Sequence, residues 1–266
     1  MEKKQIQNIS LFYEPQESET AGIILDALPG IQLCIGDTWG LDSTIACKTY
    51  VMTSWQQFMF HSAAWPRKIL MGLFYPLVYL QVRRTWALAG GYTLPAKTPV
   101  VGIKPYHMIQ SARNKIGERI FVPEESPEEK IQHIACHEFT HAFSSYLQLP
   151  MWLHEGLAMG TVDKFLGKNS IRKDTLDVLS QPFANKHPRT YRNLDPSDVN
   201  TTIYQIVRGY WLTRFLEDTN LDTLKDLLKI RLSPMELENR IAKSCHLETH
   251  SFWQEIDSKI TAHFSN

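Results

Sequence analysis

The residues of this 266-residue chain best suited to chemistry are two histidines and a glutamate within five consecutive positions. His137 and His141 are four residues apart, and Glu138 directly follows the first of them. If the stretch is helical, both imidazoles lie on one face, one turn apart, where they can bind a single metal ion. Glu138 lies about 100° around the helix from His137, so its carboxylate can handle the proton of a water molecule beside the ion. This H-E-x-x-H pattern predicts a zinc site.

The residues before this pentapeptide predict the start of the helix that it needs. Ser126 is a typical N-cap, Pro127 is favoured at the first helical position, and Glu129 completes a capping box. A pentapeptide of this kind arises by chance in about a few per cent of chains of this size, and the histidines could then be ordinary core or surface residues. The predicted helix places the histidines opposite one apolar face, which contains Ile131, Ala135, Cys136, Phe139, Ala142, Phe143 and Tyr146.

A third ligand candidate, Glu155, lies in the segment Pro-Met-Trp-Leu-His-Glu-Gly-Leu-Ala at residues 150–158. Here the chain resembles the gluzincin metallopeptidases, in particular bacterial peptidase MA-like families in which H-E-x-x-H is followed by Trp-Leu-x-Glu-Gly-x-Ala. The likeness covers most of residues 104–266. It implies that His137, His141 and Glu155 bind Zn²⁺, with Glu138 as the general base. A catalytic zinc ion usually has three protein ligands and keeps its fourth position for water.

The resemblance and the chemistry of these residues predict a zinc-dependent metallopeptidase, a hydrolase that acts on a peptide or protein substrate. A zinc ion held by two imidazoles and one carboxylate stays positively charged, which lowers the pKa of a bound water to about 7. Glu138 takes the proton of that water and delivers it to the leaving amine. Two alternatives stay open: a non-catalytic protein that binds a peptide or partner, and a zinc hydrolase of a non-peptide amide. A purely structural zinc site has no need of Glu138.

Gluzincins commonly supply a tyrosine from a later helix to stabilise the oxyanion. Tyr204 and Tyr210 are the two candidates here, and each is alternatively a structural aromatic with a hydrogen-bonded hydroxyl. Thermolysin-like members also have an acidic residue one turn beyond the glutamate ligand, where this chain has Met159. Asp163, a backbone carbonyl or another oxygen must then orient the ligand histidines.

Two further histidines lie close to the predicted ligands in sequence. His154 precedes Glu155, and adjacent helical residues point about 100° apart, so we expect a bystander or a substrate contact. His133 lies one turn before His137 and could line the cleft, although a surface position is the commoner outcome for such a residue.

The charge balance and the cysteines limit the classes of partner and compartment. Lysine plus arginine and aspartate plus glutamate both number 28, and no basic stripe with interleaved aromatics is present, so we expect no nucleic-acid partner. Residues 1–8 contain no apolar signal-peptide region, which favours a cytoplasmic location with reduced thiols. In an oxidising compartment Cys34 and Cys47 could pair, whereas Cys136 is predicted to act as a small buried hydrophobe.

An apolar segment at residues 69–80 has basic and tryptophan-containing flanks. At twelve residues with Pro76 inside, it is too short to cross a bilayer of about 30 Å as a helix. It fits a buried helix or helical hairpin, a cleft lid or partner surface, or peripheral docking at a membrane interface.

The overall pattern predicts an α+β fold. A small mixed or antiparallel sheet lies in residues 1–125, and a mainly helical, zincin-like catalytic region occupies residues 126–266 and joins it in one compact unit. In gluzincins the strand that corresponds to residues 117–123 borders the cleft and pairs with extended peptide, although a plain sheet edge would look the same. A long polar loop at residues 167–200 is expected to cover the cleft or regulate access to it. We expect strands at residues 6–13, 31–35, 44–52, 99–103 and 117–123. We expect helices at residues 20–28, 174–180, 202–218, 221–232, 235–244 and 250–264.

Overall fold

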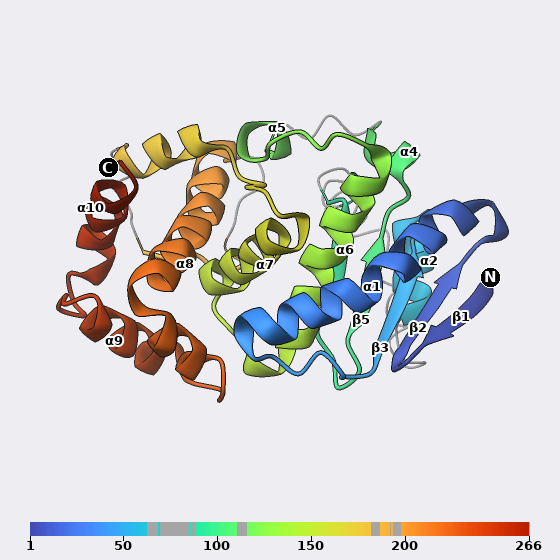
Figure 1. The fold of residues 1–266 in the computed structure, drawn as a ribbon, viewed down its shortest axis with the longest axis horizontal. Helices are drawn as coiled ribbons and strands as arrows, with labels where there is room; N and C mark the ends of the chain where they lie inside the picture. Colours follow the sequence, from blue (N-terminus) through green and yellow to red (C-terminus); the bar gives the residue numbers. More distant parts are fainter. Residues whose placement is uncertain are drawn as a thin grey trace. The chain divides into compact units, whose positions relative to one another are not determined.

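Figure 1 shows the fold in a computed structural model of the chain. The structure describes residues 1–62, 69, 86, 89–110, 116–181, 187–191, 193 and 198–265. Apart from the exposed Ile69, the apolar segment at residues 69–80 lies outside these residues, so the three interpretations of it stay predictions. No helix in the described part of the chain has the length and apolar content needed to cross a membrane.

The chain folds into two compact units that are each discontinuous in sequence, whereas a division at residue 125 would have made two contiguous regions. Unit 1 comprises Met1–Gln32, Thr44–Lys115 and Glu124–Ala142. Unit 2 comprises Leu33–Ser43, Ile116–Pro123 and Phe143–Asn266. The helices α1 (Ser18–Trp39) and α6 (Pro127–Ser144) carry residues of both units.

Unit 1 contains a five-stranded mixed sheet in the order β1-β2-β3-β5-β4. The two outer pairs, β1–β2 and β4–β5, are antiparallel, and the two inner pairs are parallel. A mixed sheet beside many helices confirms the α+β prediction at this level. The strands are β1 (Glu2–Ile6), β2 (Ile9–Tyr13), β3 (Cys47–Val51), β4 (Gly91–Leu94) and β5 (Val100–Ile103).

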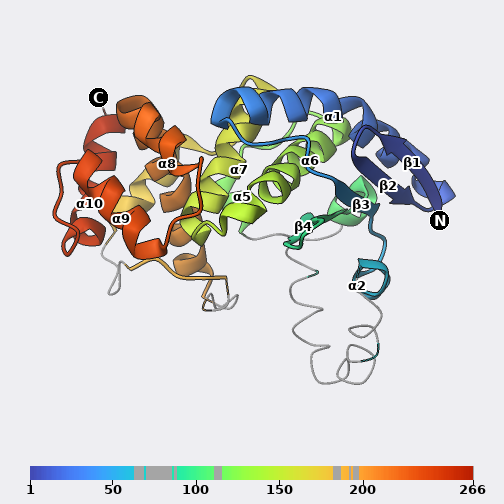
Figure 2. The ribbon, with the colours of Figure 1, turned by 90° about the horizontal axis from the view of Figure 1, so that it is seen from below.

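The two faces of this sheet pack against different helices. Side chains alternate between the faces of a strand, and on one face Tyr50 and Val100 form an apolar cluster with Phe58 of α2 (Trp55–Ser62). On the other face Leu11, Val101 and Ile103 are also buried. Figure 2 shows α2 below the strands of unit 1, with α1 and α6 above them. The face that carries Val101 is therefore the one that meets α6.

Two predicted strands are wrong. Residues 31–35 belong to α1, which continues through Pro29; Leu28, Ile31 and Ile35 are all fully buried at helical spacing. Residues 117–123 begin with the short helix α5 (Gly117–Ile120), and Phe121 then makes an isolated antiparallel bridge to Ile171. A short apolar run does not distinguish a strand from a helical turn. The strand next to α6 at the edge of the sheet is instead β4, which the sequence did not predict.

The remaining strand predictions hold for their main elements. Residues 44–52 and 99–103 contain β3 and β5. The predicted strand at residues 6–13 is β2 together with the end of β1. Gln7, with φ of 48°, lies in the turn between these two strands. A hairpin was missed because β1 is polar and almost entirely exposed, so it lacks the alternation that identifies a half-buried strand.

Unit 2 is mainly helical, and its helix predictions are confirmed with shifted ends. The helices predicted at residues 202–218 and 221–232 form α8, whose backbone departs from helical geometry at Asn220. The short helix predicted at residues 174–180 is the 3₁₀ helix η3. The main elements after α6 are η2 (Ser145–Leu147), α7 (Met151–Leu166), η3 (Lys173–Ser180), α8 (Val199–Leu227), α9 (Pro234–Ser244) and α10 (Phe252–Phe264). Unit 1 also contains two short elements, η1 (Pro15–Glu17) and α4 (Tyr106–Gln110).

Helices α7 and α8 approach each other closely at two glycines. A Cβ atom on Gly156 would overlap the Thr213 hydroxyl and the Gly209 carbonyl, and one on Gly209 would overlap the carbonyl of Trp152. Only glycine leaves room for backbone contact of this kind. The glycine that follows Glu155 in the sequence segment thus fixes the packing of the helix that carries Glu155.

Candidate metal site

Helix α6 begins as the sequence predicts. The Ser126 hydroxyl accepts a hydrogen bond from the Glu129 backbone N–H at 3.1 Å, and Pro127 is the first helical residue. The Glu129 carboxylate accepts a hydrogen bond from the backbone N–H of Glu125 at 3.0 Å. The predicted apolar face is buried, except that Tyr146 lies beyond the helix end with 45% of its surface exposed.

His137 and His141 direct their ring nitrogens toward each other from successive turns of α6. Their Nε2 atoms are 3.0 Å apart, and their ring planes are nearly perpendicular, at 88°. His141 is buried and His137 half-buried. This arrangement follows from the i, i+4 spacing, which puts two side chains above one another on one helix face. The pair therefore offers two nitrogen ligands from one face of α6.

Glu138 is buried against strand β4. The Thr93 hydroxyl lies 2.7 Å from the Glu138 Oε2 atom and 3.0 Å from the Glu138 backbone carbonyl oxygen. Gly91 lies two residues before Thr93 on the same face of β4. A Cβ atom on Gly91 would come within 2.5 Å of Glu138 Cγ. Sequence reasoning found Glu138 but missed both strand residues, for which the only signal is the Gly90-Gly91 pair.

Glu155 lies in the first turns of α7, half-buried. The Tyr191 hydroxyl donates a hydrogen bond to the Glu155 Oε1 atom at 2.7 Å. The same hydroxyl lies 3.1 Å from Nδ1 of His154, so the predicted bystander histidine has a partner beside the ligand. Tyr191 was not singled out from the sequence because it lies in the polar stretch at residues 167–200, which has no periodicity. The expectation that this stretch covers the cleft or regulates access to it stays a prediction, and the contact that the structure has is that of Tyr191 with Glu155.

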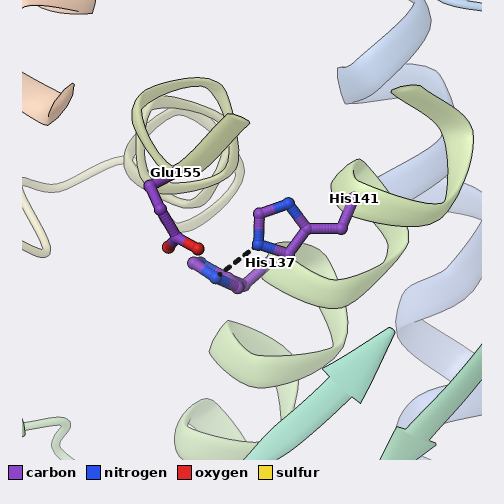
Figure 3. Close-up of side chains that lie close together, drawn as sticks. All are labelled: His137, His141 and Glu155. Carbon is purple, nitrogen blue, oxygen red and sulfur yellow. Dashed lines mark hydrogen bonds between the residues drawn. The ribbon is translucent and has the colours of Figure 1, made fainter. Parts of the chain in front are cut away.

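The structure groups the three predicted ligand residues. One ligand atom from each of His137, His141 and Glu155 lies within 4.8 Å of the others, and Figure 3 shows the imidazoles and the carboxylate pointing toward one another. Nitrogen and oxygen ligands of a tetrahedral zinc ion lie about 3.3 Å from one another. Two imidazoles and one carboxylate are donor types that zinc binds. No protein-family model, curated protein or solved structure matches this chain.

Tyr204 and Tyr210 lie in the core of unit 2. The Tyr204 hydroxyl donates to Asp257 at 2.7 Å, and the Arg208 guanidinium donates to the same carboxylate at 2.8 Å. The Tyr210 hydroxyl donates to Asp163 at 2.7 Å. Burial raises the pKa of both tyrosines well above the usual value, and the neighbouring carboxylates raise it further. Both hydroxyls are therefore committed donors, which is the structural role that the sequence left open as the alternative.

Asp163 is occupied in the same way. Besides the Tyr210 hydroxyl, its carboxylate accepts hydrogen bonds from the backbone N–H of Ser170 at 2.7 Å and from the Ser170 hydroxyl at 2.6 Å. The bonds from Ser170 join the segment after α7 to that helix, and the bond from Tyr210 joins α8 to α7. The carboxylate thus has three donors within unit 2, which makes it a structural residue of α7.

His133 is buried, which corrects the expectation of a surface histidine. Its Nδ1 atom lies 2.8 Å from the Glu124 carboxylate, which also receives the Lys130 ammonium at 2.7 Å. Burial opposes the charge of Glu124, but the His133 hydrogen bond and Lys130 lower its pKa to about 2. Burial lowers the pKa of His133 more than Glu124 raises it. An anionic Glu124 thus anchors the first turns of α6.

Proposed function

We propose that this chain is a zinc-dependent metallopeptidase of the gluzincin type. The observation that carries the proposal is the grouping of His137, His141 and Glu155, with Glu138 adjacent to the first ligand. The resemblance of the H-E-x-x-H pentapeptide and the segment around Glu155 to gluzincins points in the same direction. The cofactor of the proposal is one zinc ion, bound by two imidazoles and one carboxylate.

When bound, zinc supplies a Lewis acid that acidifies a water molecule and polarises the scissile carbonyl. Glu138 accepts the proton of the water as it attacks and passes that proton to the leaving amine. Both transfers use the same carboxylate, so Glu138 starts and ends the cycle as an anion. His137, His141 and Glu155 would hold the ion. The reaction class is hydrolysis of an amide bond.

The environment of Glu138 favours an enzyme over a structural zinc protein. A structural zinc site is closed by four protein ligands and has no use for a base. Among the described residues three donors form the group, and the carboxylate of the neighbouring Glu138 lies 2.7 Å from the Thr93 hydroxyl on β4. A buried carboxylate kept beside a three-ligand group is what base catalysis requires.

Strand β4 supports a peptide as the substrate. It is the terminal strand of the five-stranded sheet formed by the described residues, and Thr93 places it in contact with Glu138. An extended peptide can add to such an edge through main-chain hydrogen bonds, which gives affinity without a fixed sequence. A small non-peptide amide would gain nothing from a strand edge. The proposal therefore moves the peptide-binding strand from residues 117–123 to β4.

A peptide-library digestion read by mass spectrometry tests this function. Zinc-loaded wild type should cleave peptides, and Glu138→Gln should lower the rate by about 10²- to 10⁴-fold, the usual worth of a general base. Its zinc content should equal that of wild type. Glu128→Gln is the matched control because Glu128 is an exposed glutamate on the same helix. Wild type that holds one zinc ion per chain and cleaves no peptide would overturn the proposal.

A further inference from the structure

We propose that Thr93 of β4 is a positioning residue for the general base Glu138. This inference rests on the proposed function for its catalytic meaning and on the contacts within unit 1 for its geometry. It makes the edge strand a part of the catalytic machinery, beyond any role in binding an extended substrate.

The Thr93 hydroxyl contacts two oxygens of one residue. It lies 2.7 Å from the carboxylate Oε2 of Glu138 and 3.0 Å from the backbone carbonyl oxygen of the same residue. Its single proton donates to one of them at a time, and the bond to an anionic carboxylate is the stronger. A hydroxyl placed between the main chain and the carboxylate restricts the side-chain torsions of Glu138. The Oε2 atom is thereby held beside the Thr93 hydroxyl.

Two glycines allow β4 to approach Glu138 this closely. A Cβ atom on Gly91 would lie 2.5 Å from Glu138 Cγ and 2.8 Å from Oε1. A Cβ atom on Gly90 would lie 2.8 Å from Cδ1 of Ile134, one turn earlier on α6. Neither glycine has a positive φ, so space and not backbone conformation requires them. The α6 side of β4 therefore presents bare backbone at residue 91 and a hydroxyl at residue 93.

The sheet supplies a matched control for Thr93. Thr49 of β3 and Thr93 of β4 both pair with Val101 of β5, one on each side, so the two threonines lie in one row on the same face. Thr49 is fully buried, and its hydroxyl lies 4.0 Å from Cys47 Sγ. A threonine-to-valine change at either site removes one hydroxyl from a strand position, which is buried at Thr49 and half-buried at Thr93. Only the change at Thr93 removes a contact with Glu138.

The kinetic test compares Thr93→Val, Thr93→Ser and Thr49→Val on one quenched fluorescent peptide that the wild type cleaves. Thr93→Val should lower kcat on the order of 10- to 100-fold, the range typical of a hydrogen bond to a charged group, with KM within about twofold. Thr93→Ser keeps the hydroxyl and should recover kcat to within about threefold. Thr49→Val should match wild type. Equal kcat for Thr93→Val and Thr49→Val would overturn the inference while leaving the proposed function intact.

A second measurement does not depend on activity. Crystal structures of the zinc-loaded wild type, Thr93→Val and Thr49→Val should show the Glu138 carboxylate rotated from its place only in Thr93→Val. An unmoved carboxylate in Thr93→Val would overturn the positioning role. If the wild type cleaves no peptide, the proposed function fails and the catalytic meaning of Thr93 fails with it. The crystal structures then still decide whether Thr93 holds Glu138.

Discussion

Helices α6 and α8 both carry polar side chains at helical spacing, yet the structure uses them in different ways. On α6 the two histidines face each other with Nε2 atoms 3.0 Å apart, and Glu138 receives one hydroxyl from β4. On α8 the polar groups of Tyr204 and Arg208 are both bound to one buried carboxylate, that of Asp257 on α10. The histidines of α6 lie where they could bind an ion. The polar groups of α8 form hydrogen bonds with Asp257 inside unit 2.

The difference shows what residue spacing can and cannot predict. An i, i+4 pair of histidines is a local arrangement, so a helix brings the imidazoles together wherever it lies. A tyrosine on a later helix acts at a site only if the packing of that helix points it there. Asp257 and Asp163 are distant in sequence from the tyrosines that they bind, and this pairing carries no periodic signal. Substitutions should therefore lower the stability of the chain when they affect the polar residues of α8, and its activity when they affect those of α6.

The largest effect on stability is expected for the buried ion pair of unit 2. Arg208 and Asp257 are fully buried, and Arg208 also donates to the backbone carbonyl of Trp253 at 2.9 Å. Arg208→Met leaves the carboxylate buried without its charged partner, which should cost about 3–5 kcal/mol in the free energy of urea unfolding.

The matched control is Arg240→Met, because Arg240 pairs with Glu236 on the surface of α9. That change should cost less than about 1 kcal/mol. Equal losses for the buried and the exposed arginine would contradict the structural role assigned to α8. If Glu138→Gln lowered the free energy of unfolding as much as Arg208→Met, the polar residues of α6 and α8 would not differ in their contribution to stability.

A smaller loss is expected when the tyrosines of α8 lose their hydroxyls. Tyr204→Phe and Tyr210→Phe each remove a buried hydrogen bond to a carboxylate, which should lower the unfolding free energy by about 1–3 kcal/mol. Because both hydroxyls are committed within unit 2, kcat for peptide cleavage should stay within about twofold of wild type. A hundredfold loss of kcat in either variant, without a matching loss of stability, would indicate that this tyrosine stabilises the oxyanion.

The smallest effect expected is a pH-dependent one at the start of α6. The pKa of Glu124 is about 2 in the folded chain, below its ordinary value of 4.5, so its ion pairs stabilise the fold above pH 4.5. This contribution is lost as the pH falls from about 4.5 toward 2, because the unfolded chain takes up the proton first. The lowered pKa of His133 acts in the same direction, beginning at higher pH.

Urea unfolding of wild type and Glu124→Gln over this pH range measures the effect. At pH 7 the variant should be less stable by about 1–2 kcal/mol. The gap should narrow between pH 4.5 and 3. A gap that is constant with pH would show that the charge of Glu124 is not the source of its stabilising effect.

Much of the site could be predicted from sequence because it depends on local rules. The cap at Ser126, the apolar face of α6 and the ligand spacing all follow from helical geometry, and the structure has them. Residues 31–35 were wrongly predicted as a strand because a short apolar run does not distinguish a strand from a helix, whereas the buried face of α1 continues through them. Thr93 and Tyr191 were missed because their roles come from contacts distant in sequence, with residues 138 and 155.

Titration of zinc into metal-free protein tests the central claim, the three-ligand metal site, most directly. Wild type should bind one zinc ion per chain, and Glu155→Ala should bind it on the order of 100-fold more weakly because one charged ligand is lost. Glu128→Gln, an exposed change on α6, should bind like wild type. Equal zinc affinity for Glu155→Ala and wild type, or no stoichiometric binding by wild type, would contradict the proposal of a three-ligand zinc site.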